Sequence, residues 1–169
     1  LNDILENVYD DYIELGGEDD ANVDPAMICA RAIINRQIKD RRHNASVMVI
    51  GQEHNHGEPF RSGGCCTPQG NEKALKYMKV AESEGIPIHF FIFTPGTWPT
   101  EEGPGAAQQI TRNIYTMVKL QVPMISMISE GVGGGAEAIG LSDYRIMASH
   151  GYYSVIPPER AAAIEGKIS

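Results

Sequence analysis

The chain has 169 residues, which is enough for one domain with a substantial core and too few for two ordinary domains. Its 42% hydrophobic and 21% charged residues are typical of a soluble globular protein, and the net charge of −8 argues against nucleic acid as the main partner. No apolar run is long enough to span a membrane, and no signal peptide opens the chain. Because the first residue is Leu1, we expect a fragment or a processed product.

The first part of the chain predicts one helix and two strands. Apolar residues recur at helical spacing over 4–15, and the glycine pair 16–17 is expected to end that helix. The apolar segments 27–34 and 47–50 predict two strands, the second of which ends at Gly51.

Two polar segments are predicted to be loops. The basic run 36–42 is expected to be solvated, with contact to an anionic ligand or partner as the alternative. The segment 52–70 is rich in His, Gly, Pro and Cys, which indicates a long loop. Its His54 and His56 are expected to be solvated rather than ligands or bases. The cysteine pair 65–66 is expected to lie in this loop without binding zinc.

The rest of the chain alternates helices with strands, which defines an α/β class with a largely parallel sheet. Loops at Gly96 and at 131–135 each follow a predicted strand, so they should lie at the same edge of that sheet. The predicted elements are a helix opened by Asn71 and closed by Gly85, a strand over 87–93, a helix over 107–117, strands over 122–128, 144–148 and 152–156, and a final helix after Pro157.

The most informative segment is 129–138, Ser-Glu-Gly-Val-Gly-Gly-Gly-Ala-Glu-Ala, which follows the predicted strand 122–128. Glycines at a helix start expose backbone N–H groups, and the helix dipole favours negative charge there. The segment therefore predicts a site for a phosphate, a carboxylate or a developing oxyanion.

Several familiar phosphate and nucleophile motifs are excluded by the residues of this segment. A Walker loop needs Lys and then Ser or Thr where 136–137 is Ala-Glu. Gly131, Gly133 and Ala136 fit a dinucleotide fingerprint, but no acidic residue follows at 148–152. No Gly-x-Ser-x-Gly elbow occurs. Two interpretations remain open: a backbone oxyanion hole, or glycines that only allow close packing of helix on sheet.

An ordered set of motifs is similar to one known family. Phe-Ile-Phe-Thr-Pro-Gly-Thr-Trp-Pro at 91–99 resembles that family's Phe-Ile-Asp-Thr-Pro-Gly-Ala-Tyr-Pro, and 130–138 resembles its Glu-Gly-Gly-Ser-Gly-Gly-Ala-Leu-Ala. The family is the alpha subunit of the carboxyltransferase of bacterial and plastid acetyl-CoA carboxylase. Further matching segments are Val-Met-Val-Ile-Gly-Gln at 47–52, Pro-Gln-Gly-Asn-Glu-Lys-Ala-Leu at 68–75, Glu-Glu at 101–102, Ile-Thr-Arg-Asn at 110–113 and Tyr-Ser-Val-Ile-Pro-Pro-Glu at 153–159.

The resemblance implies a crotonase-like fold, a β-β-α superhelix, with 1–169 as a single, shortened carboxyltransferase domain. It implies an alpha-type subunit that uses carboxybiotin, held on a biotin carboxyl carrier protein, to convert acetyl-CoA to malonyl-CoA for fatty acid synthesis. A beta-type subunit with a zinc ribbon would bind acetyl-CoA, and this chain would need no metal of its own. The expected location is the bacterial cytoplasm or the plastid stroma.

The resemblance also implies the site residues. Gly134 and Gly135 would form a backbone oxyanion hole for the ureido oxygen of biotin, with no protein base required. Trp98 would either pack over its loop or form a wall against the biotin ring, whereas 101–102 would start a helix rather than act as an acid–base pair. The expected substrate-binding residues are Gly96, Trp98, Gly131, Val132 and Gly133.

Five positions depart from the family pattern, namely Phe93, Val132, Gly133, Glu137 and Arg160. A carboxylate at Glu137 is expected to suit the dipole at a helix start, but it would repel a carboxylated ligand if it faced the pocket. Two alternatives therefore remain beside the active subunit. One is a noncatalytic paralogue with an interaction or regulatory role, and the other is a stand-alone crotonase-like enzyme that acts on an acyl-CoA.

Overall fold

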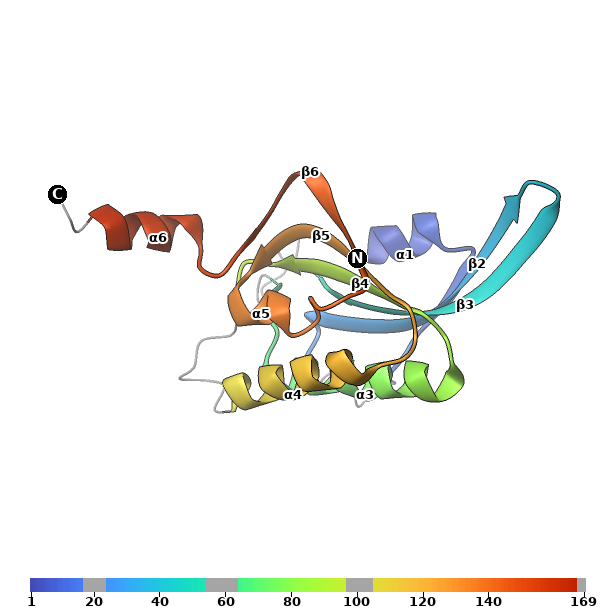
Figure 1. The fold of residues 1–169 in the computed structure, drawn as a ribbon, viewed down its shortest axis with the longest axis horizontal. Coiled ribbons are helices and arrows are strands. Elements are labelled where there is room, and N and C mark those ends of the chain that lie inside the picture. Colours follow the sequence, from blue (N-terminus) through green and yellow to red (C-terminus); the bar gives the residue numbers. More distant parts are fainter. Residues whose placement is uncertain (17–23, 54–63, 97–104, 167–169) are drawn as a thin grey trace.

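A computed structural model of the protein describes residues 1–16, 24–53, 64–96 and 105–166. The strands form one six-stranded sheet in sequence order, as Figure 1 shows. β1, β2 and β3 pair antiparallel, whereas β3, β4, β5 and β6 pair parallel. The strands are β1 Asp11–Glu14, β2 Met27–Ile38, β3 Arg41–Gln52, β4 Ile88–Thr94, β5 Met124–Val132 and β6 Tyr144–Ser154.

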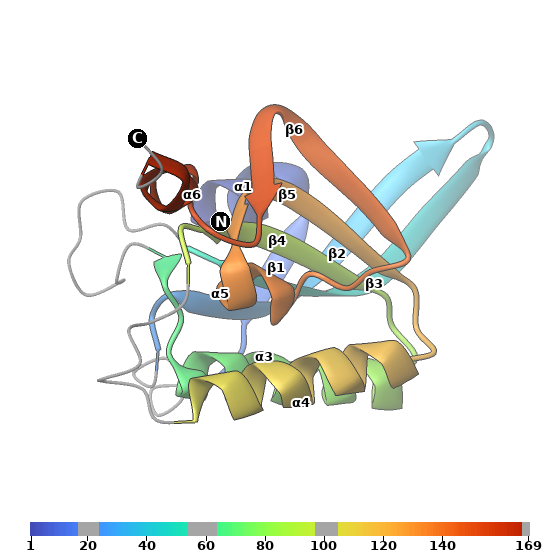
Figure 2. The same cartoon turned by 60° about the vertical axis from the view of Figure 1, so that its left-hand side comes forward.

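Helices lie on both sides of this sheet. α3 and α4 lie side by side on one face, and α1 lies on the opposite face, as the two views in Figures 1 and 2 agree. No helix of the described residues is long and apolar enough to cross a membrane. The helices are α1 Asn2–Val8, α3 Pro68–Glu84, α4 Ala106–Lys119, α5 Gly133–Glu137 and α6 Pro158–Glu165.

The central strands bury both of their faces, which explains their nearly continuous apolar sequences. Side chains alternate along each strand. In β4, Phe90 and Ile92 pack into the core under α3 and α4, whereas Phe91 packs into the core under α1. In β3, Met48 and Val49 divide between the two cores in the same way. The predicted strands 27–34, 47–50, 87–93 and 122–128 are all confirmed; β2 and β3 are longer than predicted, whereas β4 and β5 both begin and end later.

The helix predicted over 4–15 is wrong in its second half. α1 ends at Val8, and the next residue, Tyr9, is extended. The segment 11–14 forms β1, which pairs antiparallel with 30–33 of β2. Local spacing favoured a helix, but the backbone of this segment completes the edge of the sheet instead, which only the tertiary fold provides.

The next helix begins earlier than predicted, at Pro68 rather than Asn71. Thr67 is its N-cap, because the Thr67 Oγ1 atom accepts a hydrogen bond from the Gly70 N–H at 3.2 Å. The buried carboxylate of Asp24 in turn accepts from the Thr67 backbone N–H at 2.6 Å and from its hydroxyl at 2.9 Å. At the other end, Gly85 in a left-handed conformation closes α3 as predicted.

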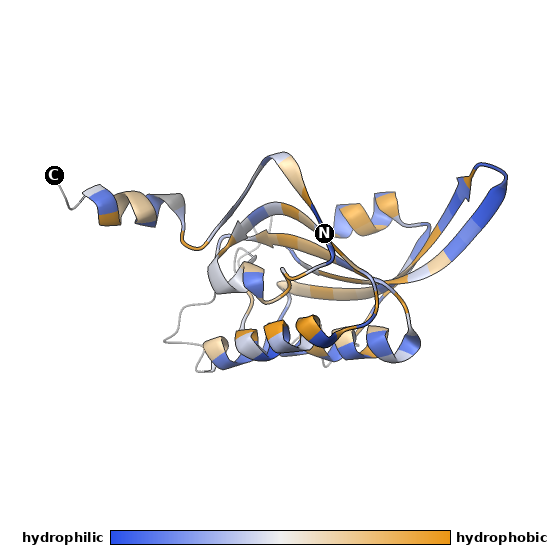
Figure 3. Ribbon diagram, viewed as in Figure 1, coloured by the Kyte–Doolittle hydropathy of each residue, from blue (hydrophilic) through white to orange (hydrophobic). Residues whose placement is uncertain are grey.

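The basic run 36–42 is not a loop, so that expectation is corrected. β2 and β3 continue their pairing to Ile38 and Arg41, and only Lys39 and Asp40 form the turn. The resulting hairpin arm, 35–44, projects beyond the body of the sheet and is mostly hydrophilic (Figure 3). Cross-strand backbone hydrogen bonds hold these residues in two strands, although their polar composition had indicated a loop.

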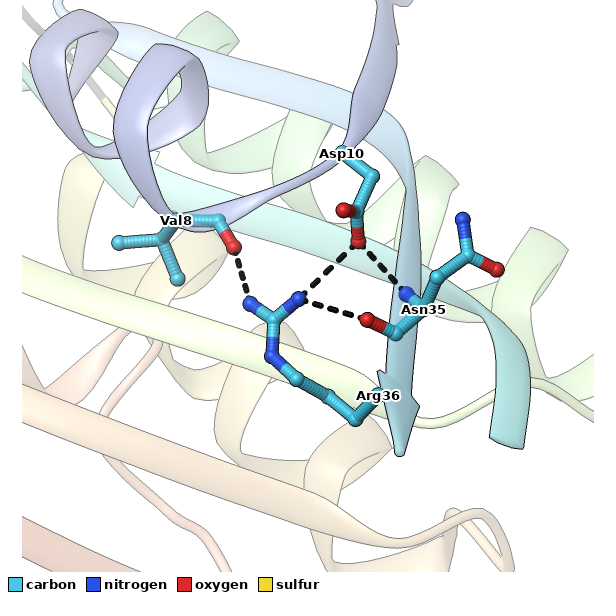
Figure 4. Close-up of polar contacts among 4 residues, drawn as sticks. All are labelled: Val8, Asp10, Asn35 and Arg36. Atoms are coloured by element: carbon cyan, nitrogen blue, oxygen red, sulfur yellow. Dashed lines mark hydrogen bonds and ion pairs between the residues drawn. The ribbon is translucent and has the colours of Figure 1, made fainter. Parts of the chain in front are cut away.

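Arg36 fixes the base of the hairpin arm to the segment between α1 and β1 (Figure 4). Its guanidinium donates to the Val8 carbonyl at 2.6 Å and to the Asp10 carboxylate at 3.1 Å. The same carboxylate accepts from the Asn35 N–H at 2.6 Å. A single carboxylate therefore joins the α1–β1 connection to the arm.

We expect Arg36→Ala to lower the free energy of unfolding by about 1 kcal/mol, because the pair is half exposed and screened by solvent. Urea unfolding checks this value. The matched control is Arg42→Ala on the same arm, since Arg42 makes no ion pair within the described ranges. Equal losses in the two variants would contradict the assigned role of Arg36.

The strands predicted at 144–148 and 152–156 form a single strand, β6, and Gly151 does not make a turn. Both halves pair parallel with β5, and the register shifts between Ile128 and Glu130. The intervening residues of β6 are accommodated as an irregularity within the strand rather than as a reversal of the chain. The final helix expected after Pro157 is confirmed as α6.

Candidate functional site

The glycine-rich segment is a direct junction of strand and helix rather than a long loop. β5 continues through Gly131 and Val132, and α5 begins at Gly133. Gly133 has φ +58°, a left-handed conformation that glycine adopts without strain and that turns the chain into α5. The first N–H groups of any α-helix have no partner inside the helix, so the N–H groups of Gly134 and Gly135 are placed as donors.

The two predicted loops meet at the same edge of the sheet. Thr94 at the end of β4 is in register with Gly131 of β5, which aligns the segments that follow. A Cβ atom added to Gly135 would lie 2.4 Å from the Gly96 carbonyl oxygen, so the two backbones are in direct contact. The expected convergence of the Gly96 and glycine-rich segments is therefore confirmed.

Thr94 holds Gly96 in this position. The Thr94 hydroxyl donates to the Gly96 carbonyl at 2.7 Å and accepts from the Gly96 N–H at 3.3 Å. Thr94 is fully buried at the end of β4. The carbonyl that faces Gly135 is thus fixed by a buried side chain.

Gln52 is a buried part of this site that the sequence motifs did not single out. Its side-chain amide donates from Nε2 to the Gly135 carbonyl at 2.7 Å and accepts at Oε1 from the Phe93 N–H at 3.1 Å. The side chain is 1% exposed at the end of β3. The sequence feature that could have indicated Gln52 is a polar residue directly after Gly51, at the carboxyl end of a buried strand.

A hollow of about 590 Å³ lies beside the candidate site, beyond α5. Tyr153 of β6 lines this hollow and also contacts the glycine-rich segment, since a Cβ atom on Gly131 would lie 2.6 Å from its ring. Burial raises the pKa of Tyr153, and the charge of Glu137 raises it further. The hollow is lined by Ile114, Ile128, Glu137, Gly140, Leu141, Arg145, Met147 and Tyr153.

The position of Glu137 corrects the expectation for its charge. Glu137 is the last residue of α5, where the helix dipole is negative, so the dipole does not favour its carboxylate. It lines the 590 Å³ hollow, and the first-turn donors of Gly134 and Gly135 lie at the opposite end of the helix. Its charge is therefore directed to the hollow rather than to the donor end.

Two further departures from the family pattern lie in strands, and Arg160 is exposed in α6. Phe93 is half-buried in β4, and Val132 is the buried last residue of β5. Trp98, the glutamates 101–102 and the histidines His54 and His56 lie outside the described residues.

The cysteines have the character of buried thiols. Burial raises the pKa of Cys65, and it raises that of the fully buried Cys66 still further. No disulfide joins the three cysteines, all of which lie within the described residues, and Cys29 is buried. Over 1–16, 24–53, 64–96 and 105–166, no three His, Cys, Asp or Glu side chains gather as a metal site.

Solved structures with the same fold define the class of this protein. One is the transcarboxylase 12S core described with methylmalonyl-coenzyme A and methylmalonic acid bound, with a TM-score of 0.78, 20% identity, and coverage of 98% of this chain and 30% of that one. Another is the beta subunit of Pseudomonas aeruginosa geranyl-CoA carboxylase, with a TM-score of 0.76, 16% identity and coverage of 98% and 30%. At these identities the likeness concerns the fold alone: an α/β protein of the crotonase-like class.

Sequence comparison then assigns the family. The family model described as acetyl co-enzyme A carboxylase carboxyltransferase-like matches residues 1–167, so the chain belongs to this family. Acetyl-coenzyme A carboxylase carboxyl transferase subunit alpha of Chlorobaculum parvum is 40% identical over 91% of this chain and 47% of its own length. The proteins of the same name from Flavobacterium johnsoniae and Staphylococcus carnosus are each 38% identical, over 92% and 99% of this chain. The chain spans about half the length of these curated relatives.

Proposed function

We propose that this chain is a single carboxyltransferase domain of alpha type that transfers a carboxyl group from carboxybiotin to acetyl-CoA, giving malonyl-CoA. Membership of the family over 1–167 supports the reaction class. The observation that carries the site is the contact between Gly135 and the Gly96 carbonyl, which brings two strand ends together beside the first turn of α5.

Gly134 and Gly135 would act as a backbone oxyanion hole. Carboxybiotin supplies the carboxyl group, and its ureido oxygen gains negative charge as that group leaves. Neutral N–H donors at the positive end of a helix suit such an oxygen, because they stabilise the charge that develops and need no proton transfer of their own. The residues present therefore fit the group, and the chain's part is to bind and to orient it.

The neighbouring residues would form the walls of the pocket. The Gly96 segment lies against α5 on one side, held by Thr94. Val132 is buried, and Gly131 packs closely on Tyr153, so this part of the site is tightly packed. Gly133 and Trp98 complete the proposed substrate-binding set with Gly96, Gly131 and Val132.

The partners would be a beta-type subunit with a zinc ribbon, which binds acetyl-CoA, and a biotin carboxyl carrier protein. The relatives are named as one subunit of acetyl-coenzyme A carboxylase, which supports a reaction shared between chains.

Reconstitution tests this function. The chain is combined with a beta-type subunit, and malonyl-CoA decarboxylation is measured with free biotin. Turnover that needs both chains supports the proposal. Absence of turnover in a stable complex would favour the noncatalytic paralogue, and acyl-CoA turnover by the chain alone would favour the stand-alone enzyme.

A further inference from the structure

We propose that Gln52 is a positioning residue that sets the orientation of the first turn of α5 relative to the Gly96 segment. Its effect on turnover rests on the proposed function, whereas its effect on the backbone of α5 does not. Gln52 touches the backbone of both segments through one side chain, which no other described side chain does by the hydrogen bonds observed.

The Gly135 carbonyl is available to Gln52 because the amides that follow it bond elsewhere. Ala138 N–H donates to the Gly134 carbonyl at 3.0 Å, and Ile139 N–H donates to the Ala136 carbonyl at 3.3 Å. The Gly135 carbonyl instead accepts from Gln52 Nε2. The side chain therefore replaces a helical hydrogen bond that α5 does not make.

The hydrogen bond to the Gly135 carbonyl also fixes the direction of the Ala136 N–H group. The Gly135 carbonyl and the Ala136 N–H belong to one planar trans peptide unit and point in opposite directions. Once the carbonyl is held by Gln52, rotation of this unit is prevented, and the adjacent peptide of Gly134 and Gly135 is restrained with it. Gln52 therefore restrains the peptide that carries the Gly135 N–H, which is one of the two proposed donors.

The other end of the Gln52 amide fixes the Gly96 side. Regular pairing of β3 with β4 ends at Gly51 and Phe91, and β4 has an irregularity between Ile92 and Phe93. The Phe93 N–H donates to Gln52 Oε1 at this point. Phe93 is followed by Thr94, which holds Gly96, so Gln52 links the first turn of α5 to the Gly96 segment through one buried side chain.

The amide can work in only one orientation. A flipped amide would place its oxygen against the Gly135 carbonyl oxygen and its NH₂ group against the Phe93 N–H. Both contacts would be repulsive in a buried setting. The hydrogen bonds therefore determine the side-chain orientation as well as the backbone spacing.

α5 needs this external support because of its own sequence. It has five residues and begins with three glycines, Gly133 to Gly135. Glycine is a poor helix former, and a helix of this length is not stable by itself in water. We infer that packing and Gln52 together keep the first turn in the geometry that the site requires.

Gln52→Met tests the proposal, since methionine keeps the length and the packing but makes neither hydrogen bond. The matched control is Asn113→Leu in the α3–α4 interface, where Asn113 donates to the Asn71 carbonyl at 2.8 Å and accepts from Gln109 at 2.9 Å. Both variants lose two hydrogen bonds of a buried amide. Hydrogen exchange is measured in this chain at Ala138 and Ile139, whose N–H groups donate to the Gly134 and Ala136 carbonyls of α5, and kcat and KM are measured with the beta-type partner.

We expect Gln52→Met to speed exchange at Ala138 and Ile139 by about 10- to 100-fold and to lower kcat about 100-fold with KM changed less than about threefold. Asn113→Leu should change neither readout at the site. Gln52→Glu, which keeps an oxygen for the Phe93 N–H but loses the amide donor in its ionised form, is expected to show the same pattern. It serves as the second variant if methionine prevents folding.

The outcomes separate the two proposals. Unchanged exchange at Ala138 and Ile139, or unchanged kcat with faster exchange, would overturn the role of Gln52. If the wild-type chain and its partner show no turnover, the proposed function fails, while faster exchange in Gln52→Met still supports the structural role. An equal loss of kcat in Asn113→Leu would mean that Gln52→Met acts through a general loss of stability, and it would overturn the proposal.

Discussion

Gly134→Val is expected to lower the kcat/KM of carboxyl transfer by about 100-fold or more without lowering the free energy of unfolding. Gly134 is half-buried in the first turn of α5, where its N–H is one of the two proposed donors. The valine side chain would cover the N–H donor and block the approach of the ligand oxygen. Valine has a higher helix propensity than glycine, which is why no loss of stability is expected.

Gly134→Ala is the matched control for this variant. Alanine should stabilise the helix by about 1 kcal/mol at most and should reduce turnover far less than valine does. Steady-state kinetics with the beta-type partner and thermal unfolding of the chain are the two measurements. Full activity in Gly134→Val, in a folded protein, would refute the oxyanion role of this residue.

The elements that sequence predicted correctly are those set by local pattern. Apolar runs at 87–93 and 122–128 indicated buried parallel strands; β4 has a core on each face, whereas β5 is buried on one face and exposes Met127 on the other. Gly85 was recognisable as a helix end, because a left-handed residue closes α3. In each case the signal lay within a few residues of the feature.

The elements that were predicted incorrectly depend on distant partners. The segment 11–14 has helical spacing, but it pairs with β2. The run 36–42 is polar, yet cross-strand pairing extends it as two strands. Composition does not report on backbone hydrogen bonds to another strand, so neither feature could be found from its own residues.

The location of the site could be predicted from the sequence, but the buried side chain that holds its backbone segments in place could not. Strand order places Gly96 and Gly135 at one edge of the sheet, and the register of Thr94 with Gly131 brings them together. Gln52 could not be assigned from sequence, because its partners Phe93 and Gly135 are 41 and 83 residues away. A buried amide that bridges two backbone segments has no sequence motif.

Gly135→Ala is expected to lower both stability and activity, in contrast to Gly134→Val. The added Cβ atom would lie 2.4 Å from the Gly96 carbonyl oxygen and 2.9 Å from its carbon, which are backbone atoms that a side-chain rotation cannot move. Thr94 also holds Gly96 in place, so the segment has to shift against a buried hydrogen bond. We expect a loss of about 1–3 kcal/mol in the free energy of unfolding and a fall in kcat of at least about tenfold.

Gly166→Ala controls for the effect of adding a methyl group at a glycine. Gly166 is the C-cap of α6 with φ −70°, and a Cβ atom there meets nothing within 4 Å, so both stability and kcat should be unchanged. Urea unfolding and steady-state kinetics of the two variants are compared with wild type. If Gly135→Ala were as stable and as active as Gly166→Ala, the Gly96 segment would have to yield freely, and a rigid wall at this position could not be part of the mechanism. A loss of stability together with kcat would instead mean that close backbone contact, and not only the N–H donors, sets the geometry of the site.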